Sequence, residues 1–289
     1  MPFSYSLPTP LDYFAALVHS DAHFPLLEAA ASIAQDEYPE LDLQQVLGEV
    51  DQVQARLKRR IPANASPLQR LRQLNQFFFT ELGFGGNANN YYDPENSFLH
   101  TVLTTRRGIP VSLAVLWLEL AHASGLQARG VAFPGHFMVK VVLPNGQVVI
   151  DPLTGQSLGR EELLERLEPY PYARKLSEDD MPLGLYLQAA MPRDIVARML
   201  RNLKEIFRAQ QDWERLLAVQ NRLVVLLPQV WQERRDRGLL HADHGDPAQA
   251  IADLEAYLAH VPDKTTEQNA RETAAIAERL HALRRSVGF

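Results

Sequence analysis

One stretch of the chain, residues 84–155, most constrains what the protein can fold into. It opens with a polar loop rich in glycine and asparagine. It continues into a strongly apolar segment at residues 110–125, which starts with proline and ends with glycine, as helices often do. Short apolar runs then predict three strands, at residues 127–133, 137–143 and 147–151. A Pro-Asn-Gly turn at residues 144–146 joins the last two as a hairpin. The stretch therefore predicts a helix packed on a small antiparallel sheet, which is an α+β arrangement.

More helices are predicted ahead of this stretch. Apolar residues recur at three- and four-residue spacing across residues 11–35, 43–59 and 67–81. That period marks amphipathic helices, and we expect the first to break near Pro25. Residues 83–105, by contrast, predict a long ordered loop with one helical turn between residues 94 and 103. A loop this long, with so many polar and aromatic groups, more often serves function than connection.

The last third of the chain is helical and repeats. The segment from Asp212 to Pro228 parallels the segment from Asp246 to Pro262, and both ends are offset by 34 residues. A helix pair of that period with a closing proline is typical of tetratricopeptide repeats, and a generic helical hairpin bundle is the alternative. Two such units are fewer than the three that an independent stack usually needs. We therefore expect them to lean on the first domain and on a final helix at residues 265–286.

Charge and hydropathy narrow the possible partners and the location. The net charge of −6 provides no bulk positive field for nucleic acid or for an anionic membrane, so we expect neither as a partner. The N-terminus lacks the basic and apolar regions of a secretory signal. The longest apolar run, at residues 109–121, is too short to span a bilayer. We therefore expect a cytoplasmic protein.

The chain contains no cysteine, which excludes disulfides, thiolate metal sites and a cysteine nucleophile. It also has no phosphate-binding glycine loop, no dinucleotide fingerprint and no zinc-ligand spacing. We therefore expect no cofactor and no metal.

Residues 106–151 resemble the transglutaminase-like core, the fold family of papain-type cysteine acyl-transfer enzymes. In that family the motif R-G-x-C-x-x-x-A opens the helix, G-[IL]-x-A-R ends it, and histidine and then aspartate follow on strands. The matching segments here are RGIPVSLA at residues 107–114, GLQAR at 125–129, GHF at 135–137 and IDP at 150–152. The alignment of the first two motifs needs no gap and puts Pro110 where the family carries its catalytic cysteine.

The similarity extends to nearly the whole chain. The loop NYYDPENS at residues 90–97 and the repeats after the core resemble a bacterial subgroup, the SirB-type proteins, which pair a transglutaminase-like domain with tetratricopeptide repeats. We accordingly predict an α+β fold with a helical N-terminal bundle and a transglutaminase-like, papain-type core at residues 1–185. One helix, at residues 159–167, precedes a linker, and all-α repeats are predicted at residues 190–289.

The mechanism that the resemblance implies needs three groups. A thiolate at the helix N-terminus attacks, an imidazole accepts its proton, and a carboxylate orients the imidazole. His136 and Asp151 match the last two groups, whereas Pro110 offers no nucleophile. Ser112 lies two residues further along and could present a hydroxyl near the same helix end, although the alignment gives it a neighbouring position rather than the nucleophile's own.

Three interpretations of this site follow. We favour a non-catalytic, regulatory protein in which His136 and Asp151 remain as a hydrogen-bonded pair in a degenerate cleft, while the repeats at residues 200–262 bind a protein or peptide. The alternative is a serine-dependent amidase, peptidase or acyltransferase that uses Ser112, His136 and Asp151. The third is ligand recognition in the same cleft. For binding we predict contacts from the polar loop and from the arginine before the helix, namely Asn90, Tyr92, Asp93, Asn96 and Arg107.

Overall fold

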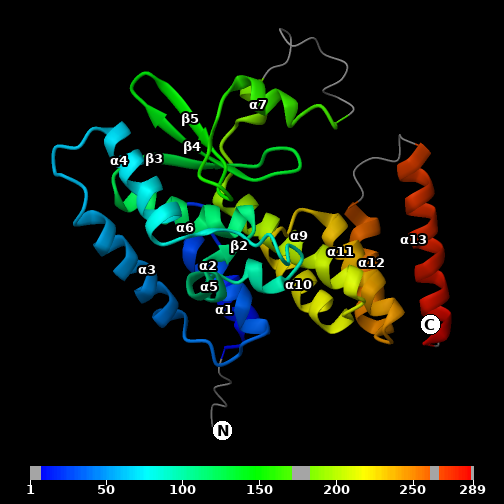
Figure 1. Cartoon of the computed structure of the whole chain (residues 1–289). Helices are drawn as coiled ribbons and strands as arrows, with labels where there is room; N and C mark the ends of the chain where they lie inside the picture. Colours follow the sequence, from blue (N-terminus) through cyan, green and yellow to red (C-terminus); the bar gives the residue numbers. More distant parts are fainter. Residues whose placement is uncertain (1–7, 171–182, 261–266, 288–289) are drawn as a thin grey trace. The chain divides into compact units, whose positions relative to one another are not determined.

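The computed structural model describes residues 8–170, 183–260 and 267–287. Two compact units make up the chain (Figure 1). The core unit is Ser20–Met199, and the repeat unit combines Met1–His19 with Leu200–Phe289. In the described part, helices predominate and the main sheet is small and confined to the core unit, so the predicted α+β class is confirmed. None of the helices in those ranges is long and apolar enough to cross a membrane.

The first part of the core unit is helical, as predicted. Its elements are α2 (Leu26–Ser32), the 3-10 turn η1 (Ile33–Asp36), α3 (Leu43–Lys58), α4 (Pro67–Asn75) and a π-helical turn, η2 (Gln76–Glu81). The break near Pro25 is also confirmed, because α1 (Pro10–Leu17) ends before it. The side chains of Asp42 and Ser66 accept hydrogen bonds from N–H groups of the first turns of α3 and α4. These caps fix where both helices start.

The polar loop holds more regular structure than the sequence predicted. The turn η3 (Pro94–Ser97) was expected, but a full helix, α5 (Leu99–Thr105), follows it. Strand β1 (Gly85–Gly86) pairs in parallel with β2 (Arg107–Gly108), so hydrogen bonds join the two ends of the loop. A helix of about two turns shows too few repeats of its apolar period to be distinguished from a turn in the sequence.

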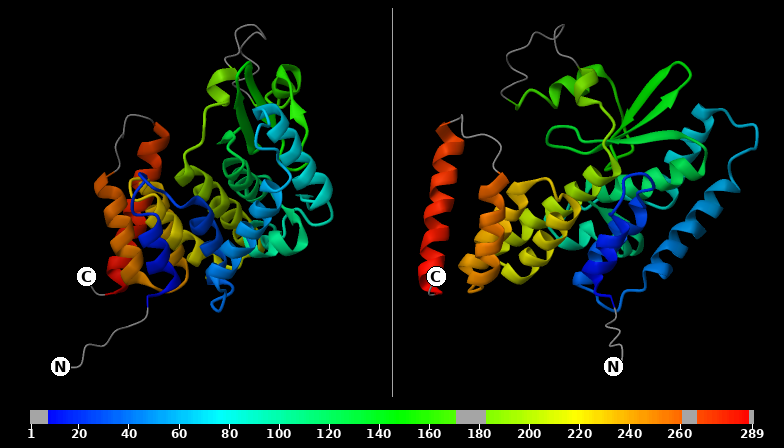
Figure 2. Two further views of the ribbon diagram at one scale, coloured as in Figure 1. Left: turned by 90° about the vertical axis from the view of Figure 1, so that its left-hand side faces the viewer. Right: turned by 180° about the vertical axis from the view of Figure 1, so that it is seen from behind.

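Helix α6 (Pro110–Ala123) lies at the centre of the core unit. Almost all of its side chains are buried, including Trp117, which explains why its sequence shows no polar face. The sheet lies on one side of α6, where α6 contacts β3 and β4, and helices α2 and α5 lie on the other side (Figures 1 and 2). The polar loop and the sheet therefore both adjoin one buried helix.

The sheet is antiparallel, in the order β3-β4-β5-β6. Its strands are β3 (Gln127–Val131), β4 (Met138–Leu143), β5 (Gly146–Ile150) and β6 (Ser157–Leu158). The predicted hairpin between β4 and β5 is confirmed, and Gly146 adopts a positive φ of 139° at its turn. Helix α7 (Arg160–Glu165) corresponds to the helix predicted at residues 159–167, and α8 (Leu183–Tyr186) follows. The predicted linker falls largely outside the described residues.

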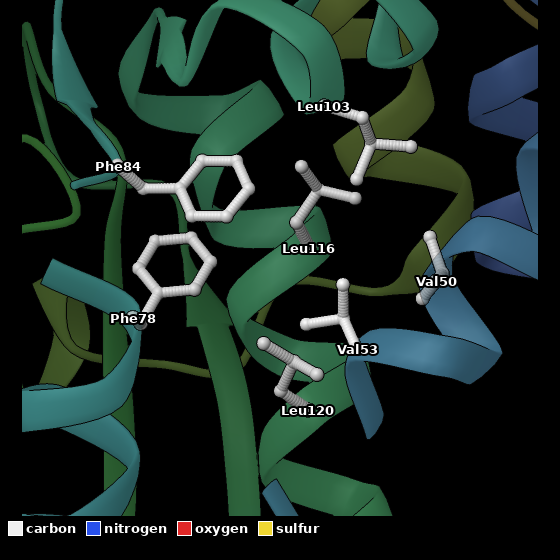
Figure 3. A pocket seen from close by; sticks show the side chains of 7 residues that line it. All are labelled: Val50, Val53, Phe78, Phe84, Leu103, Leu116 and Leu120. Atoms are coloured by element: carbon white, nitrogen blue, oxygen red, sulfur yellow. The ribbon is translucent and has the colours of Figure 1, made fainter. Parts of the chain in front are cut away.

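A small apolar cavity lies in the core between α3, α5 and α6. Its volume is about 10 Å³, close to the minimum that holds a single water molecule. The rings of Phe78 and Phe84 stack 4.3 Å apart on one side of it, and Figure 3 shows them facing Leu116 and the valines of α3. A cavity of this size is a packing defect rather than a ligand site. Its lining residues are Val50, Val53, Phe78, Phe84, Leu103, Leu116 and Leu120.

The repeat unit contains two successive helical hairpins. Their elements are α10 (Trp213–Leu226), α11 (Trp231–Asp243), α12 (Pro247–His260) and α13 (Glu267–Ser286). Asp212 and Asp246 occupy equivalent repeat positions, and each accepts a hydrogen bond from a first-turn N–H of the helix that follows it. Gly238 lets α11 approach α12, since a Cβ there would lie 2.9 Å from the side chain of Leu254. The closing Pro262 lies outside the described residues.

The two hairpins have additional helices on their N-terminal side. Helix α1 packs on α10, where the guanidinium of Arg222 lies 4.9 Å from the centre of the Phe14 ring. The C-terminal part of α9 (Pro192–Gln210) is tied to α11 by Lys204, which pairs with Glu233 and Asp236. Residues 1–19 form one compact unit with the repeat helices, and the domain ranges 1–185 and 190–289 remain a prediction.

Candidate functional site

Asp151 is the centre of the candidate site. It follows strand β5, and its side chain is only 4% exposed. One carboxylate oxygen, Oδ1, accepts a hydrogen bond from His136 Nε2 at 3.0 Å and one from the N–H of Leu153 at 2.9 Å. The other, Oδ2, accepts a hydrogen bond from Arg166 at 2.9 Å. The structure therefore brings together the predicted histidine and aspartate, and it adds an arginine that completes the pairing of the carboxylate.

Tight turns hold both residues in place. After Asp151 the chain folds back, because the carbonyl of Asp151 accepts a hydrogen bond from the N–H of Gly155 at 2.8 Å. Gly155 has a φ of 74°, which favours glycine, and a Cβ there would lie 2.5 Å from the Phe79 ring. Gly135, just before His136, has a φ of 68°, and a Cβ there would lie 1.8 Å from the Tyr170 hydroxyl. The glycine of the GHF motif is therefore required by both its conformation and its contact.

The electrostatics of the site favour an ionised Asp151. Burial by itself would raise the pKa of this carboxyl group. The hydrogen bonds from His136 and the Leu153 N–H, together with the charges of His136 and Arg166, outweigh burial and hold the pKa below its ordinary value of 3.8. The carboxylate can therefore keep His136 in a single orientation, which is the role that the family mechanism gives to its acid.

Ser112 is not brought together with this pair. It is fully buried in the first turn of α6. Its hydroxyl donates a hydrogen bond to the carbonyl of Asn96 at 2.6 Å and accepts one from the N–H of Ile109 at 3.1 Å. In the described ranges no hydrogen bond links Ser112 to His136. These contacts give the serine a structural task, which is to fasten the polar loop to the start of α6.

Asn96 organises the polar loop from inside. Its side chain is buried, and its amide nitrogen donates to the carbonyls of Asn90 and Tyr91 at 2.7 and 3.3 Å. Its amide oxygen accepts a hydrogen bond from Asn87 at 3.0 Å. Since both donors and the acceptor are used, these contacts do not support the predicted contact of the Asn96 side chain with a ligand.

The other predicted binding residues are of two kinds, those that hold the loop together and one that is largely exposed. The carboxylate of Asp93 accepts hydrogen bonds from the Asn90 side chain and from the N–H of Glu95, so Asn90 and Asp93 shape the loop. Arg107 donates to the carbonyl of Gly83 at 2.6 Å and thereby holds the start of the loop. Tyr92 is 74% exposed, and within the described ranges no hydrogen bond engages its side chain. Its role in binding remains a prediction.

Three site residues were missed in the sequence. Arg166 directly follows α7, within the helix predicted at residues 159–167, where an arginine is unremarkable. Tyr170 contacts Gly135, and Tyr91 is the neighbour of the predicted Tyr92. No periodicity or motif marks Arg166 or Tyr170, because their importance comes from contacts made across the fold. In the part of the chain that the structure describes, no three histidine or acidic side chains gather to hold a metal ion.

Comparison with known families identifies the superfamily of the core unit. A model described as the transglutaminase-like superfamily matches residues 44–201, more than half of the chain. The chain belongs to the transglutaminase-like superfamily. A model of the tetratricopeptide repeat matches residues 203–284, which confirms the repeats that the period predicted. The superfamily core and the repeats thus adjoin with almost no gap in the sequence.

Several bacterial relatives match the chain over most of their length. A UPF0162 protein of Xylella fastidiosa (strain Temecula1) is 36% identical over 243 residues, which cover 84% of this chain and 86% of the relative. A UPF0162 protein of Pseudomonas aeruginosa is 29% identical over 243 residues, with 84% and 87% covered. One of Vibrio cholerae is 27% identical over 191 residues, with 65% and 68% covered.

The names of these relatives state no activity, and they do not include SirB, so the subgroup remains a prediction. No solved structure matches the chain.

The pairing of Asp151 predicts how stability depends on pH. Because the folded-state pKa of Asp151 lies below its unfolded value, the pairing stabilises the fold above about pH 4 and is lost as the pH falls through the lowered pKa. We expect Asp151→Asn to lower the free energy of unfolding by about 3 kcal/mol near pH 7. The deficit should shrink at about pH 3, measured by denaturant titration.

The control for this prediction is Asp21→Asn, which also removes a partner of an arginine but at an exposed position. It should change the free energy of unfolding by less than about 1 kcal/mol at either pH. An Asp151→Asn deficit that is equally large at both pH values would contradict the role of the charge.

Proposed function

We propose that this transglutaminase-like protein is not an enzyme and acts by binding a protein segment, through the repeat helices at residues 200–262 and the cleft beside His136. One observation carries the proposal. The superfamily motif aligns Pro110, at the first turn of α6, with the family nucleophile, and the Ser112 hydroxyl two residues further along donates a hydrogen bond to the backbone carbonyl of Asn96. His136 then has no nucleophile to activate and serves, with Asp151, to shape the cleft.

A serine enzyme would need a different arrangement at this helix end. The serine hydroxyl must donate to the histidine that accepts its proton, and donors must face the oxyanion that forms. The Ser112 hydroxyl instead donates to Asn96, and its oxygen accepts from Ile109. Breaking both contacts would detach the loop from α6. The geometry therefore supports the binding function over the serine-dependent one.

The repeat unit offers an exposed aromatic side chain for recognition. Tetratricopeptide repeats generally mediate protein–protein interactions. Trp213 begins α10, is 40% exposed, and lies 4.8 Å from the His244 ring at the other end of the same hairpin. Many charges of the unit are paired internally, as Arg237 is with Asp253. Tryptophan is enriched among the interface residues whose truncation costs the most binding energy, so we assign the contact with the protein partner to Trp213. The cytoplasmic location expected from the sequence is part of this proposal.

An electrophilic serine probe separates the two functions. We expect a fluorophosphonate to label the folded wild-type chain no more than it labels Ser112→Ala, because the hydroxyl is buried and hydrogen-bonded to a carbonyl. Gel fluorescence and mass spectrometry provide the measurement. Stoichiometric labelling of the wild type at Ser112, absent in Ser112→Ala and in His136→Ala, would show an active serine and overturn the proposal.

The binding surface is tested with a partner captured by cross-linking from a bacterial extract and then purified. We expect Trp213→Ala to weaken its affinity for the full chain about tenfold or more, the loss typical of an aromatic anchor. The matched control is Leu185→Ala, which truncates an exposed apolar side chain of the core unit. Equal affinities of the wild type and Trp213→Ala would exclude Trp213 as the contact.

A further inference from the structure

One arginine of the core unit lacks the partner that its neighbours have. Arg198, on α9, is half-buried, and within the described ranges it makes neither a hydrogen bond nor an ion pair. By contrast, Arg166 pairs with Asp151, and Arg193, on the same helix, pairs with Asp21 at 2.7 Å. A guanidinium that is partly removed from water without an acceptor is costly, which points to an anion supplied from outside the chain.

Packing places Arg198 beside the candidate site. Ile195, one helical turn earlier, is buried against strand β3. A Cβ added at Gly130 would lie 3.0 Å from Ile195 and 2.7 Å from the ring of Phe137, the residue after His136. Residues three apart on a helix share a face. Arg198 is therefore on the side of α9 that faces the sheet where His136 lies.

Tyr91, on the polar loop, lies within electrostatic range of Arg198. Burial raises the pKa of the Tyr91 hydroxyl, and the charges of Arg198 and Asp151 act on it with opposite signs, so both lie within electrostatic range of this hydroxyl. Tyr91 is 47% exposed, and its ring contacts Tyr92 edge to face at 5.4 Å. Asn96 holds the Tyr91 backbone in position. The Tyr91 phenol and the Arg198 guanidinium thus lie within electrostatic range of each other, and the exposed ring of Tyr92 lies beside Tyr91.

We propose that Tyr91 and Arg198 bind a single carboxylate of a peptide ligand beside His136, and that Tyr92 packs on the apolar group next to that carboxylate. One guanidinium and one hydroxyl match the two oxygens of a carboxylate, whereas a phosphate dianion would leave charge unbalanced, because Arg166 is already paired with Asp151. The proposal rests on the binding function proposed above and specifies the chemistry that the cleft recognises.

The test uses two pairs of small probes with the full chain. The first pair is N-acetylphenylalanine and its amide, which differ in a terminal carboxylate. The second pair is acetyl-Phe-Glu-amide and acetyl-Phe-Gln-amide, which differ in a side-chain carboxylate. Affinities are measured by ligand-observed NMR titration. We expect the acid of at least one pair to bind about tenfold more tightly than its neutral counterpart, as expected for a charge-assisted hydrogen bond. The pair that shows the difference identifies the source of the carboxylate.

Substitutions assign the effect to the proposed residues. Arg198→Gln should abolish the preference for the acid, and Tyr91→Phe should reduce it about threefold. Arg193→Gln, the same change on the same helix at an arginine paired with Asp21, should leave it unchanged. No preference for the acid in the wild type, an unchanged preference in Arg198→Gln, or stronger competition by inorganic phosphate than by acetate would each overturn the inference.

The outcomes also separate this site from the proposed function. If Arg198→Gln loses the preference while the serine probe labels the wild type, the carboxylate site stands and the non-catalytic function fails. If binding of the partner still depends on Trp213 while the chain binds neither acid more tightly than its neutral counterpart, the proposed function stands and this inference fails.

Discussion

The carboxylate of Asp151 connects segments that the chain order keeps apart. It accepts hydrogen bonds from His136, ahead of β4, from the backbone of Leu153, in the turn after β5, and from Arg166, after α7. The turn at Leu153 also contacts β1, because the carbonyl of Leu153 accepts a hydrogen bond from the backbone N–H of Gly86. One buried charge thus aligns the sheet, the helix after it and the start of the polar loop. A charge so placed is stable only because its partners surround it.

The polar loop and α6 depend on a second connection, between Asn96 and Ser112. The side chain of Asn96 closes the loop on itself, and the backbone carbonyl of Asn96 accepts a hydrogen bond from the buried Ser112 hydroxyl. Gly108 is part of the same arrangement, since a Cβ there would lie 2.7 Å from that hydroxyl. Residues that look like catalytic or binding candidates in the sequence therefore hold the loop, and Tyr91 and Tyr92 are its exposed aromatic side chains.

The sequence predicted what local periodicity and superfamily motifs encode. Helix α6, the β4–β5 hairpin and the two repeat hairpins follow from apolar spacing, from Pro110 and Gly146, and from the 34-residue period. The pairing of His136 with Asp151 followed from the motif order. Arg166 and Arg198 could not be predicted, because one arginine in an amphipathic helix looks like another until its neighbours across the fold are known. The clustering of α1 with the repeats was missed for the same reason, since Phe14 looks like any buried helical residue.

We propose that the site keeps a base and an acid, His136 and Asp151, while Pro110 occupies the position that the superfamily motif gives to the nucleophile. The most direct measurement is the pH dependence of alkylation by iodoacetamide in full-length Pro110→Cys, where the introduced thiol is unique because the chain has no cysteine. We expect a thiol pKa well below the ordinary value of about 8.5, because α6 begins there and the superfamily mechanism gives His136 the role of proton acceptor, and we expect a higher pKa when His136→Ala is added. An ordinary titration that is the same with and without His136 would contradict this proposal.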